Sequence, residues 1–314
     1  MNVNYFLGAN SGDGFYSLYD GFCSRDDDFL YLIKAGPGGG KSGFMRSIAA
    51  AAADRGYDTR SVLCSGDPDS LDGVYIPALK VGFMDATAPH VREPRYFGFD
   101  SSYVNLGRFC ERIYDKRIAE CTDNYRAKYK KAYAYLSAAA ALDRAEKCDS
   151  AARSSARESA KRDAAALTGA GEGRSVTKLF LRCIGCKGEM VLKDDIKKLC
   201  GSLRIVDRSV ADDYLREILA HAHGNIIAAP SPLCPEKLDA VLLPSLSVGF
   251  ISSALSGDED ESEKSELMSA AMHYLKGAKA WHDELEKVYN PHVDFDALHK
   301  FTERTINKLF DGNN

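Results

Sequence analysis

Residues 35–42 read Ala-Gly-Pro-Gly-Gly-Gly-Lys-Ser, a glycine-rich run that ends in a lysine and a hydroxyl side chain. Glycines let a backbone curl with its N–H groups pointing inward, which makes a cradle for an anion. In such a cradle Lys41 can reach the outer phosphates of a nucleoside triphosphate, and Ser42 can hold Mg²⁺. We therefore predict a Mg-ATP site made by Gly36, Gly38, Gly39, Gly40, Lys41, Ser42 and Gly43.

Two elements must position this loop. Residues 29–34, Phe-Leu-Tyr-Leu-Ile-Lys, form a short apolar run that suits a buried strand. An alanine-rich amphipathic stretch follows from Gly43 to about Asp54, and Gly56 then ends it as a helix stop does. A strand, a glycine-rich loop and a helix in this order are the context that a P-loop needs. The sequence thus predicts an α/β fold with a P-loop NTPase-like parallel sheet.

A P-loop site also needs an acidic residue near the metal ion. Residues 81–85, Val-Gly-Phe-Met-Asp, predict a short strand that places Asp85 beside Mg²⁺, so Ser42 and Asp85 are the expected metal ligands. The next residue is Ala86 and not a glutamate, which leaves the general base open. Four further side chains have suitable chemistry for that role: Asp67, Asp69, His90 and Glu93.

The chain also contains an internal repeat. Residues 71–83 and 238–250 are identical at eight of 13 positions, and weaker matches extend upstream, with Gly14 on Gly188 and Gly56 on Gly224. We infer two copies of one α/β unit. The match places Asp212, Asp213 and Ser252 on Lys41, Ser42 and Asp85, so copy two is expected to be a degenerate unit without a nucleotide site.

The same comparison points to two more catalytic candidates. Asp67 and His90 fall on Cys234 and Gly257, so they change together with the nucleotide-binding residues. We therefore place Asp67 and His90 with Lys41 and Asp85 in the catalytic site. Asp72, by contrast, persists as Asp239, which indicates a structural role.

Distinctive motifs lie at residues 6–10, 14–17, 35–42, 64–74, 85–90, 105–107, 132–136 and in the run His-Asp-Glu-Leu-Glu at 282–286. Together these motifs resemble an uncharacterised family of bacterial P-loop ATP-binding proteins with a duplicated nucleotide-binding unit. The resemblance covers nearly the whole chain and implies ATP binding and phosphoryl chemistry, with no substrate specified. Members commonly keep a P-loop in both halves, and this sequence lacks the second.

We expect three domains: the active unit at 1–102, a helical hairpin insert at 103–170, and the degenerate unit with C-terminal helices at 171–314. No glycine or proline lies between Gly107 and Gly169, and a break near 122–124 would turn that helix into a hairpin. Tyr125, Tyr129 and Tyr133 share one helix face among lysines. This pattern fits a packed tyrosine stripe with a solvated basic face, or a contact with nucleotide or RNA.

The remaining composition sets limits on the class of protein. The nine cysteines are scattered, and Cys183 and Cys186 form a lone pair whose counterparts in copy one are Ala9 and Gly12, so we expect no zinc. The net charge is −4, and no stretch approaches the roughly 20 apolar residues that span a membrane. The start of the sequence has no signal-peptide pattern. We expect a cytoplasmic protein with no membrane partner.

Three functions are consistent with these residues. The leading hypothesis is a P-loop ATPase that couples hydrolysis of ATP to a conformational change. The first alternative is a small-molecule or nucleotide kinase, and the second is an ATP-gated binding module without significant turnover.

Overall fold

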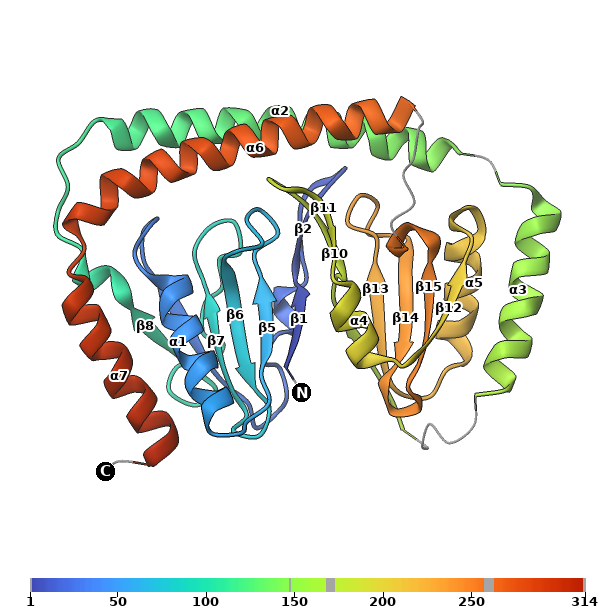
Figure 1. Cartoon of the computed structure of the whole chain (residues 1–314), viewed down its shortest axis with the longest axis horizontal. Helices are drawn as coiled ribbons and strands as arrows, with labels where there is room; N and C mark the ends of the chain where they lie inside the picture. The colour runs from blue at the N-terminus through green and yellow to red at the C-terminus, as the bar shows by residue number, and fades with distance from the viewer. Residues whose placement is uncertain (1, 147, 168–172, 257–262, 313–314) are drawn as a thin grey trace. The chain divides into compact units, whose positions relative to one another are not determined.

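The computed structural model describes residues 2–146, 148–167, 173–256 and 263–312 (Figure 1). Contacts divide the chain into two compact units. Unit 1 comprises Met1–Asn4, Phe22–Lys131 and Tyr274–Asn314, and unit 2 comprises Tyr5–Gly21 and Ala132–His273. The chain therefore passes between the two units several times.

Unit 1 is built around a six-stranded sheet with the order β1-β5-β6-β7-β4-β8. The predicted strands at 29–34 and 81–85 are confirmed as β4 and β7, which pair in parallel with Ile33 opposite Asp85. On its other side β4 pairs in parallel with β8. The strands are β1 (Val3–Phe6), β4 (Phe29–Lys34), β5 (Arg60–Leu63), β6 (Leu71–Ile76), β7 (Val81–Asp85) and β8 (Ser101–Asn105).

The expectation of a parallel sheet is wrong for part of this sheet. Strands β5 and β6 pair antiparallel, as do β6 and β7. The cause is the length of the connections: only residues 77–80 join β6 to β7, and a parallel crossover needs a dozen or more residues. The fold is thus α/β with mixed sheets that contain parallel strands.

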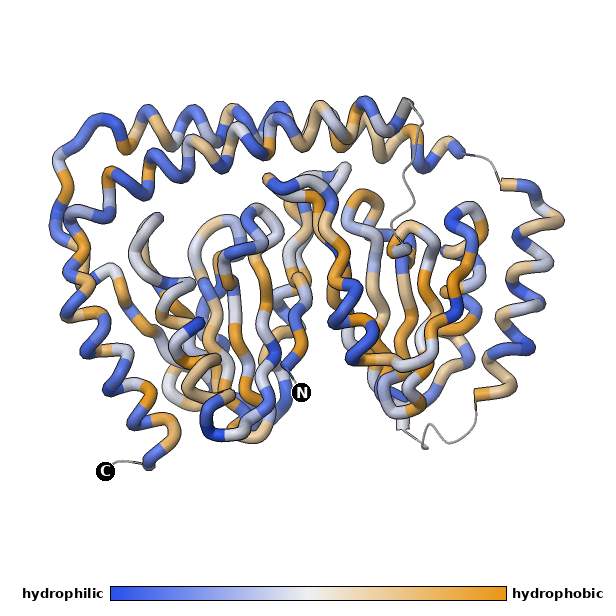
Figure 2. Tube along the Cα trace, in the orientation of Figure 1, coloured by the Kyte–Doolittle hydropathy of each residue, from blue (hydrophilic) through white to orange (hydrophobic). Residues whose placement is uncertain are grey.

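Two helices complete the core of unit 1. Helix α1 (Lys41–Asp54) buries Phe44, Met45 and Ile48 against the sheet, and helix α7 (Phe295–Asp311) packs beside α1. The rings of Phe44 and Phe301 stack with centroids 6.0 Å apart. Figure 2 shows the apolar strands and the mixed hydropathy of the helices, as expected for helices with one buried face.

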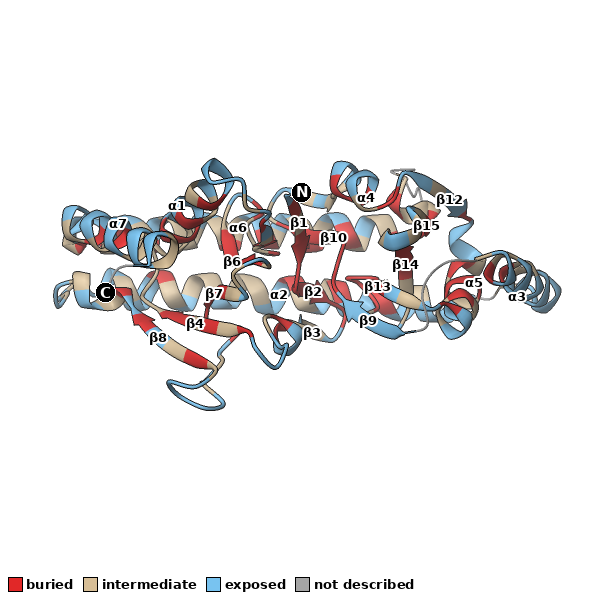
Figure 3. Cartoon of the chain, turned by 90° about the horizontal axis from the view of Figure 1, so that it is seen from below, coloured by how far each residue is buried: buried red, intermediate tan, exposed pale blue. Residues whose placement is uncertain are grey.

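Unit 2 contains a five-stranded mixed sheet with the order β12-β15-β14-β13-β9. Helix α5 (Arg208–His221) packs on this sheet, and helix α3 (Ser150–Ala165) packs on α5. Figure 3 shows α3 largely exposed outside this contact. The sheet strands are β9 (Arg174–Lys178), β12 (Ser202–Val206), β13 (Gly224–Pro230), β14 (Leu238–Leu243) and β15 (Val248–Ser252).

Two hairpins and several short helices complete the described chain. Strand β2 (Gly8–Ser11) pairs with β3 (Gly14–Ser17), and β10 (Arg182–Gly185) pairs with β11 (Gly188–Val191), both antiparallel. The short helices are α4 (Lys193–Leu199) and the 3₁₀ turns η1 (Tyr19–Gly21), η2 (Leu106–Phe109), η3 (Pro244–Leu246), η4 (Ser253–Leu255) and η5 (Asn290–His292).

The predicted helical hairpin with a break near 122–124 is wrong. Helix α2 runs unbroken over Arg117–Ala145, and α3 starts at Ser150 with the Asp149 carboxylate as its cap. Asn124 is a typical cap residue, yet its side chain donates to the carbonyl of Glu120 at 2.9 Å inside the helix. A residue that favours a cap can therefore also lie inside a helix.

The compact units also differ from the expected domains. Residues 103–131 belong to unit 1 because they include β8, and the last 41 residues belong there because α7 packs on α1. Helix α6 (Glu263–Tyr289) is one of the expected C-terminal helices, and it starts in unit 2 and ends in unit 1. The expected boundary at residue 170 lies outside the described residues.

Among the described residues, none of the helices combines the length and the apolar character that a membrane crossing requires.

Candidate functional site

The glycine-rich run forms the connection between β4 and α1, over residues 35–40. Gly38 and Gly40 have φ angles of 64° and 78°, in the left-handed region that side chains rarely adopt. A Cβ at Gly40 would lie 2.4 Å from the Leu298 side chain, and one at Gly39 would lie 2.9 Å from the Ala35 Cβ. The loop therefore needs glycine at these three positions for its conformation or for space.

Lys41 is the first residue of α1, and its ammonium group lies over the loop. It donates to the carbonyls of Ala35 and Gly36 at 3.2 and 3.0 Å, and it lies 3.6 Å from the Asp85 carboxylate. The parallel register of β4 and β7 explains this contact, since Asp85 sits beside the end of the strand that enters the loop. Asp85 is buried and also accepts from the backbone N–H and the hydroxyl of Thr87.

Ser42 joins the loop to the segment that contains Asp67. Its hydroxyl oxygen accepts a hydrogen bond from the Leu71 N–H at 3.0 Å. Asp67, four residues before Leu71, accepts from the Ser70 hydroxyl and lies 3.4 Å from the Lys279 ammonium group. Gly43 differs from the other glycines because a Cβ there would meet open space.

His90 and Asp72 form a buried pair beside Asp85. The His90 Nε2 lies 3.4 Å from the Asp72 carboxylate, and both side chains are more than nine-tenths buried. Burial by itself lowers the pKa of His90, but the charges of Asp72 and Asp85 and the hydrogen bond to Asp72 raise it more, so the net pKa lies above its ordinary value. Asp72, for which we expected a structural role, is thus in direct contact with His90, for which we expected a role in the site.

The end of α6 packs on the glycine-rich loop, which the reasoning from residue types did not foresee. A Cβ built on Gly36 would lie 3.0 Å from the Tyr289 ring. A Cβ built on Gly38 would lie within 3.4 Å of the Glu286 backbone. The Asn290 side-chain amide lies 3.2 Å from the carbonyl oxygens of Glu286 and Gly38, so its nitrogen donates to both. Only the motif at 282–286 could have signalled this contact from sequence.

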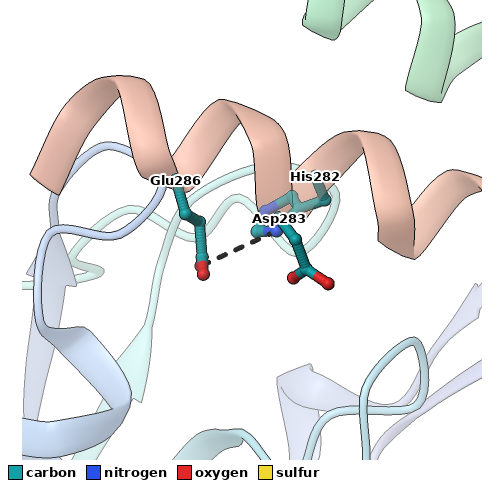
Figure 4. A group of neighbouring side chains, drawn as sticks. All are labelled: His282, Asp283 and Glu286. Atoms are coloured by element: carbon teal, nitrogen blue, oxygen red, sulfur yellow. Dashed lines mark ion pairs between the residues drawn. The ribbon is translucent and has the colours of Figure 1, made fainter.

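Three side chains of α6 leave the helix on one side and converge, as Figure 4 shows for His282, Asp283 and Glu286. One possible ligand atom from each lies within 4.8 Å of the others. The Lys279 ammonium group is ion-paired with Asp283, so a cation already neutralises part of this group. The His282 Nδ1 lies 3.6 Å from Glu286. The set is therefore better described as a charged network than as a metal centre.

The electrostatics of His282 connect this network to the loop. Burial is the main cause that lowers the pKa of His282, and the cations Lys279 and Lys41 lower it further against the opposing carboxylates of Glu286 and Asp283. The net pKa lies below its ordinary value, so the imidazole is neutral at neutral pH.

The three residues of unit 2 that the sequence repeat matches with Lys41, Ser42 and Asp85 have other partners. Asp213 is ion-paired with Arg153 and Arg157 of α3, and Asp212 accepts from the Leu238 N–H at 2.9 Å. Ser252 accepts a hydrogen bond from the Ala254 N–H. These three residues hold unit 2 together through polar contacts of their own.

Two other sequence features also have defined surroundings. Tyr125 and Tyr129 are half-buried, with ring centroids 6.2 Å apart, and the Tyr133 hydroxyl donates to Asn10 at 2.9 Å. These contacts favour the packed tyrosine stripe, while nucleotide or RNA binding by the basic face stays a prediction. Cys183 is buried in β10, and burial raises the pKa of its thiol to about 12.

Comparisons of this chain with protein families, with curated proteins and with solved structures found no match.

Proposed function

We propose that unit 1 binds Mg-ATP on residues 35–42 and hydrolyses it. One observation carries this proposal: Lys41 begins a helix directly after a glycine-rich loop and lies 3.6 Å from Asp85, at the end of the neighbouring parallel strand. Backbone N–H groups at a helix N-terminus favour phosphate, and a carboxylate beside them favours the metal ion that accompanies it.

Lys41, Ser42 and Asp85 each have a role in this proposal. The loop carbonyl contacts of Lys41 are exchanged for phosphate oxygens, which an ammonium group binds more strongly because they are charged. The Ser42 hydroxyl and the Asp85 carboxylate are hard oxygen donors of the kind that Mg²⁺ prefers. We therefore propose these two side chains as the Mg²⁺ ligands.

The coupling to movement rests on α6. Its last turn contacts Gly36 and Gly38 through Tyr289, Glu286 and Asn290. A phosphate group in the loop changes the charge and the space that this turn meets. We therefore propose that ATP and ADP favour different positions of the last turn of α6, which is the conformational change of the leading hypothesis.

The test is Lys41→Ala, which removes the cation at the phosphates. We expect at least a hundredfold weaker binding of ATP and a matching loss of ADP release, measured by calorimetry and by a coupled assay. Lys300→Ala is the matched control, because Lys300 is an exposed lysine on α7 of the same unit. A folded Lys41→Ala protein with unchanged affinity and turnover would overturn the site.

The acceptor separates the three hypotheses. ADP release without any added acceptor supports an ATPase. Release that requires a nucleoside, a nucleotide or another small molecule supports a kinase. Tight ATP binding with neither activity supports a binding module, and RNA in the same panel tests the basic face of α2.

We further propose that the two units are copies of one P-loop NTPase-like unit. The strand order β4-β7-β6-β5-β1 of unit 1 matches β12-β15-β14-β13-β9 of unit 2, and the three pairings from β4 to β5 match in direction. Matched positions also share unusual conformations: Lys80 and Ser247 both have φ of 55°, and irregularities in β5 and β13 follow Val62 and Ala229. These agreements support the duplication that the repeat predicts.

The contacts revise how the halves align. Leu71 donates to Ser42 in unit 1, whereas Leu238 donates to Asp212 in unit 2. In the sheets, Ile33 is opposite Asp85, and Val206 is opposite Ser252. We therefore align Asp212 with Ser42 and not with Lys41. Between the matched positions, Ile33 to Ser42 and Val206 to Asp212, unit 2 is shorter by three residues.

A further inference from the structure

The proposed hydrolysis needs a group that takes the proton of the attacking water, and the contacts of three of the four sequence-based candidates argue against them. Asp67 is ion-paired with Lys279, and Glu93 is ion-paired with Lys34 in an exposed position. His90 lies against the Asp72 carboxylate, which favours its protonated form. A protonated imidazole cannot accept a further proton.

His282 meets the requirements that these residues do not. It is half-buried on the face of α6 that carries Glu286, whose backbone contacts Gly38 of the loop. Its Nδ1 faces the Glu286 carboxylate at 3.6 Å, so the reaction would use Nε2. The Tyr125 ring meets the imidazole edge to face, with centroids 6.1 Å apart, which limits its rotation.

The charges around His282 suit a proton acceptor. Burial and the cations lower its pKa and outweigh the opposing carboxylates of Glu286 and Asp283, so the imidazole is neutral near pH 7. The charge of Lys41 also lowers the pKa of His282. The groups that face His282 are Lys279, Asp283 and Glu286 of α6, Lys41 of α1 and Tyr125 of α2.

We propose that His282 is the general base of the proposed phosphoryl transfer and that Glu286 is its positioning residue. This inference rests on the proposed function of the loop. The water oxygen forms a bond to the γ-phosphorus, the bond from that phosphorus to the β,γ-bridging oxygen breaks, and ADP leaves with the electron pair. The His282 Nε2 takes the proton of the water and later releases it to solvent.

The test compares His282→Gln, Glu286→Gln and a control in the full chain. His299→Gln is the control, because His299 and Glu303 form the same i,i+4 pair on α7 with the imidazole 73% exposed. The measurements are the affinity for a non-hydrolysable ATP analogue and the single-turnover rate of ATP hydrolysis between pH 5 and pH 9.

We expect His282→Gln to bind the analogue within twofold of the unmodified protein and to turn over about 10²–10⁴-fold more slowly. Glu286→Gln removes a charge that raises the pKa of His282, so the acidic limb of its pH–rate profile should move to lower pH. Added imidazole should restore part of the rate of His282→Ala. The control should change none of these quantities.

The outcomes separate this inference from the function on which it rests. Tight analogue binding with turnover of His282→Gln within twofold of the unmodified protein overturns the base and leaves the ATP site intact. Weak analogue binding by His282→Gln also overturns it, because the residue then acts in binding. Absence of ATP binding by the unmodified protein removes both proposals.

Discussion

Lys41 makes three contacts with one ammonium group, and they set how far its removal should disturb unit 1. Two are hydrogen bonds to loop carbonyls, each worth about 1 kcal/mol net, and the third is the ion pair with Asp85. Domains are stable by roughly 5–15 kcal/mol, so Lys41→Ala should still fold. Its loss of ATP binding would therefore report on the phosphates and not on unfolding.

The pair of His90 and Asp72 makes a separate prediction about pH. The raised pKa of His90 means that the folded protein holds a proton more tightly than the unfolded chain does. This contribution is complete below the unfolded pKa of about 6.5 and is lost as the pH rises through the folded value. His90→Gln should therefore cost roughly 1–3 kcal/mol at pH 6 and less at pH 9, measured by urea denaturation.

The His299→Gln variant serves as the control for this prediction as well, because His299 is exposed and forms an i,i+4 ion pair with Glu303. An equal loss of stability at both pH values in His90→Gln would show that His90 is neutral in the folded state.

At the scale of elements, the loop between β4 and α1 contains glycines of two kinds. Gly40 has a positive φ and contacts Leu298, whereas Gly43 lies in the first turn of α1 with open space around it. Gly40→Ala should destabilise unit 1 by about 1–3 kcal/mol and weaken ATP binding. Gly43→Ala should leave binding unchanged and stabilise α1 by about 0.5–1 kcal/mol, because alanine favours helix more than glycine does.

Thermal unfolding and calorimetry with an ATP analogue measure both effects on the same two variants. If Gly40→Ala binds the analogue as tightly as the unmodified protein, the left-handed turn is not part of the phosphate cradle.

The elements that local sequence predicts well are those with local causes. The apolar run at 29–34 and the run ending at Asp85 coincide with β4 and β7, and Asn290 follows the last residue of α6. Their hydrophobic pattern and the proline at 291 are visible without any partner. The antiparallel pairing of β6 with β7 follows from a connection that is too short for a parallel crossover. The length of that connection alone would have predicted the pairing.

The parts of the site that sequence could not predict depend on distant contacts. Gly38 meets Glu286 and Asn290 from almost 250 positions further along the chain, and no local period encodes that approach. Likewise, the partner of Asp72 is His90 in unit 1, whereas the corresponding Asp239 in unit 2 pairs with Arg182. An aspartate at both positions of the repeat therefore did not reveal which side chain each aspartate contacts.

The two units share one order of five strands, but the connection from strand to helix differs between them. In unit 1 six residues separate β4 from α1, and in unit 2 only Asp207 separates β12 from α5. The Asp207 carboxylate accepts from the Ser209 N–H at 2.9 Å, so the N-terminus of α5 is already capped by a negative charge of the chain itself. A phosphate would have to displace it.

The last prediction is therefore that the protein binds one ATP per chain, in unit 1. Unit 2 offers no glycine in the connection and no lysine at its helix start, and it places Ser252 where Asp85 would be. Asp212 and Asp213 are held by Leu238 and by arginines of α3. Calorimetry with a non-hydrolysable analogue should give a stoichiometry near one, and Lys41→Ala should reduce it to zero. Asp212→Lys, which adds a lysine one residue after the position matched with Lys41, should add no second site, because the three missing loop residues are not restored. A stoichiometry near two, or binding that survives Lys41→Ala, would show that the shorter connection of unit 2 can hold a triphosphate and that unit 2 has a working nucleotide site.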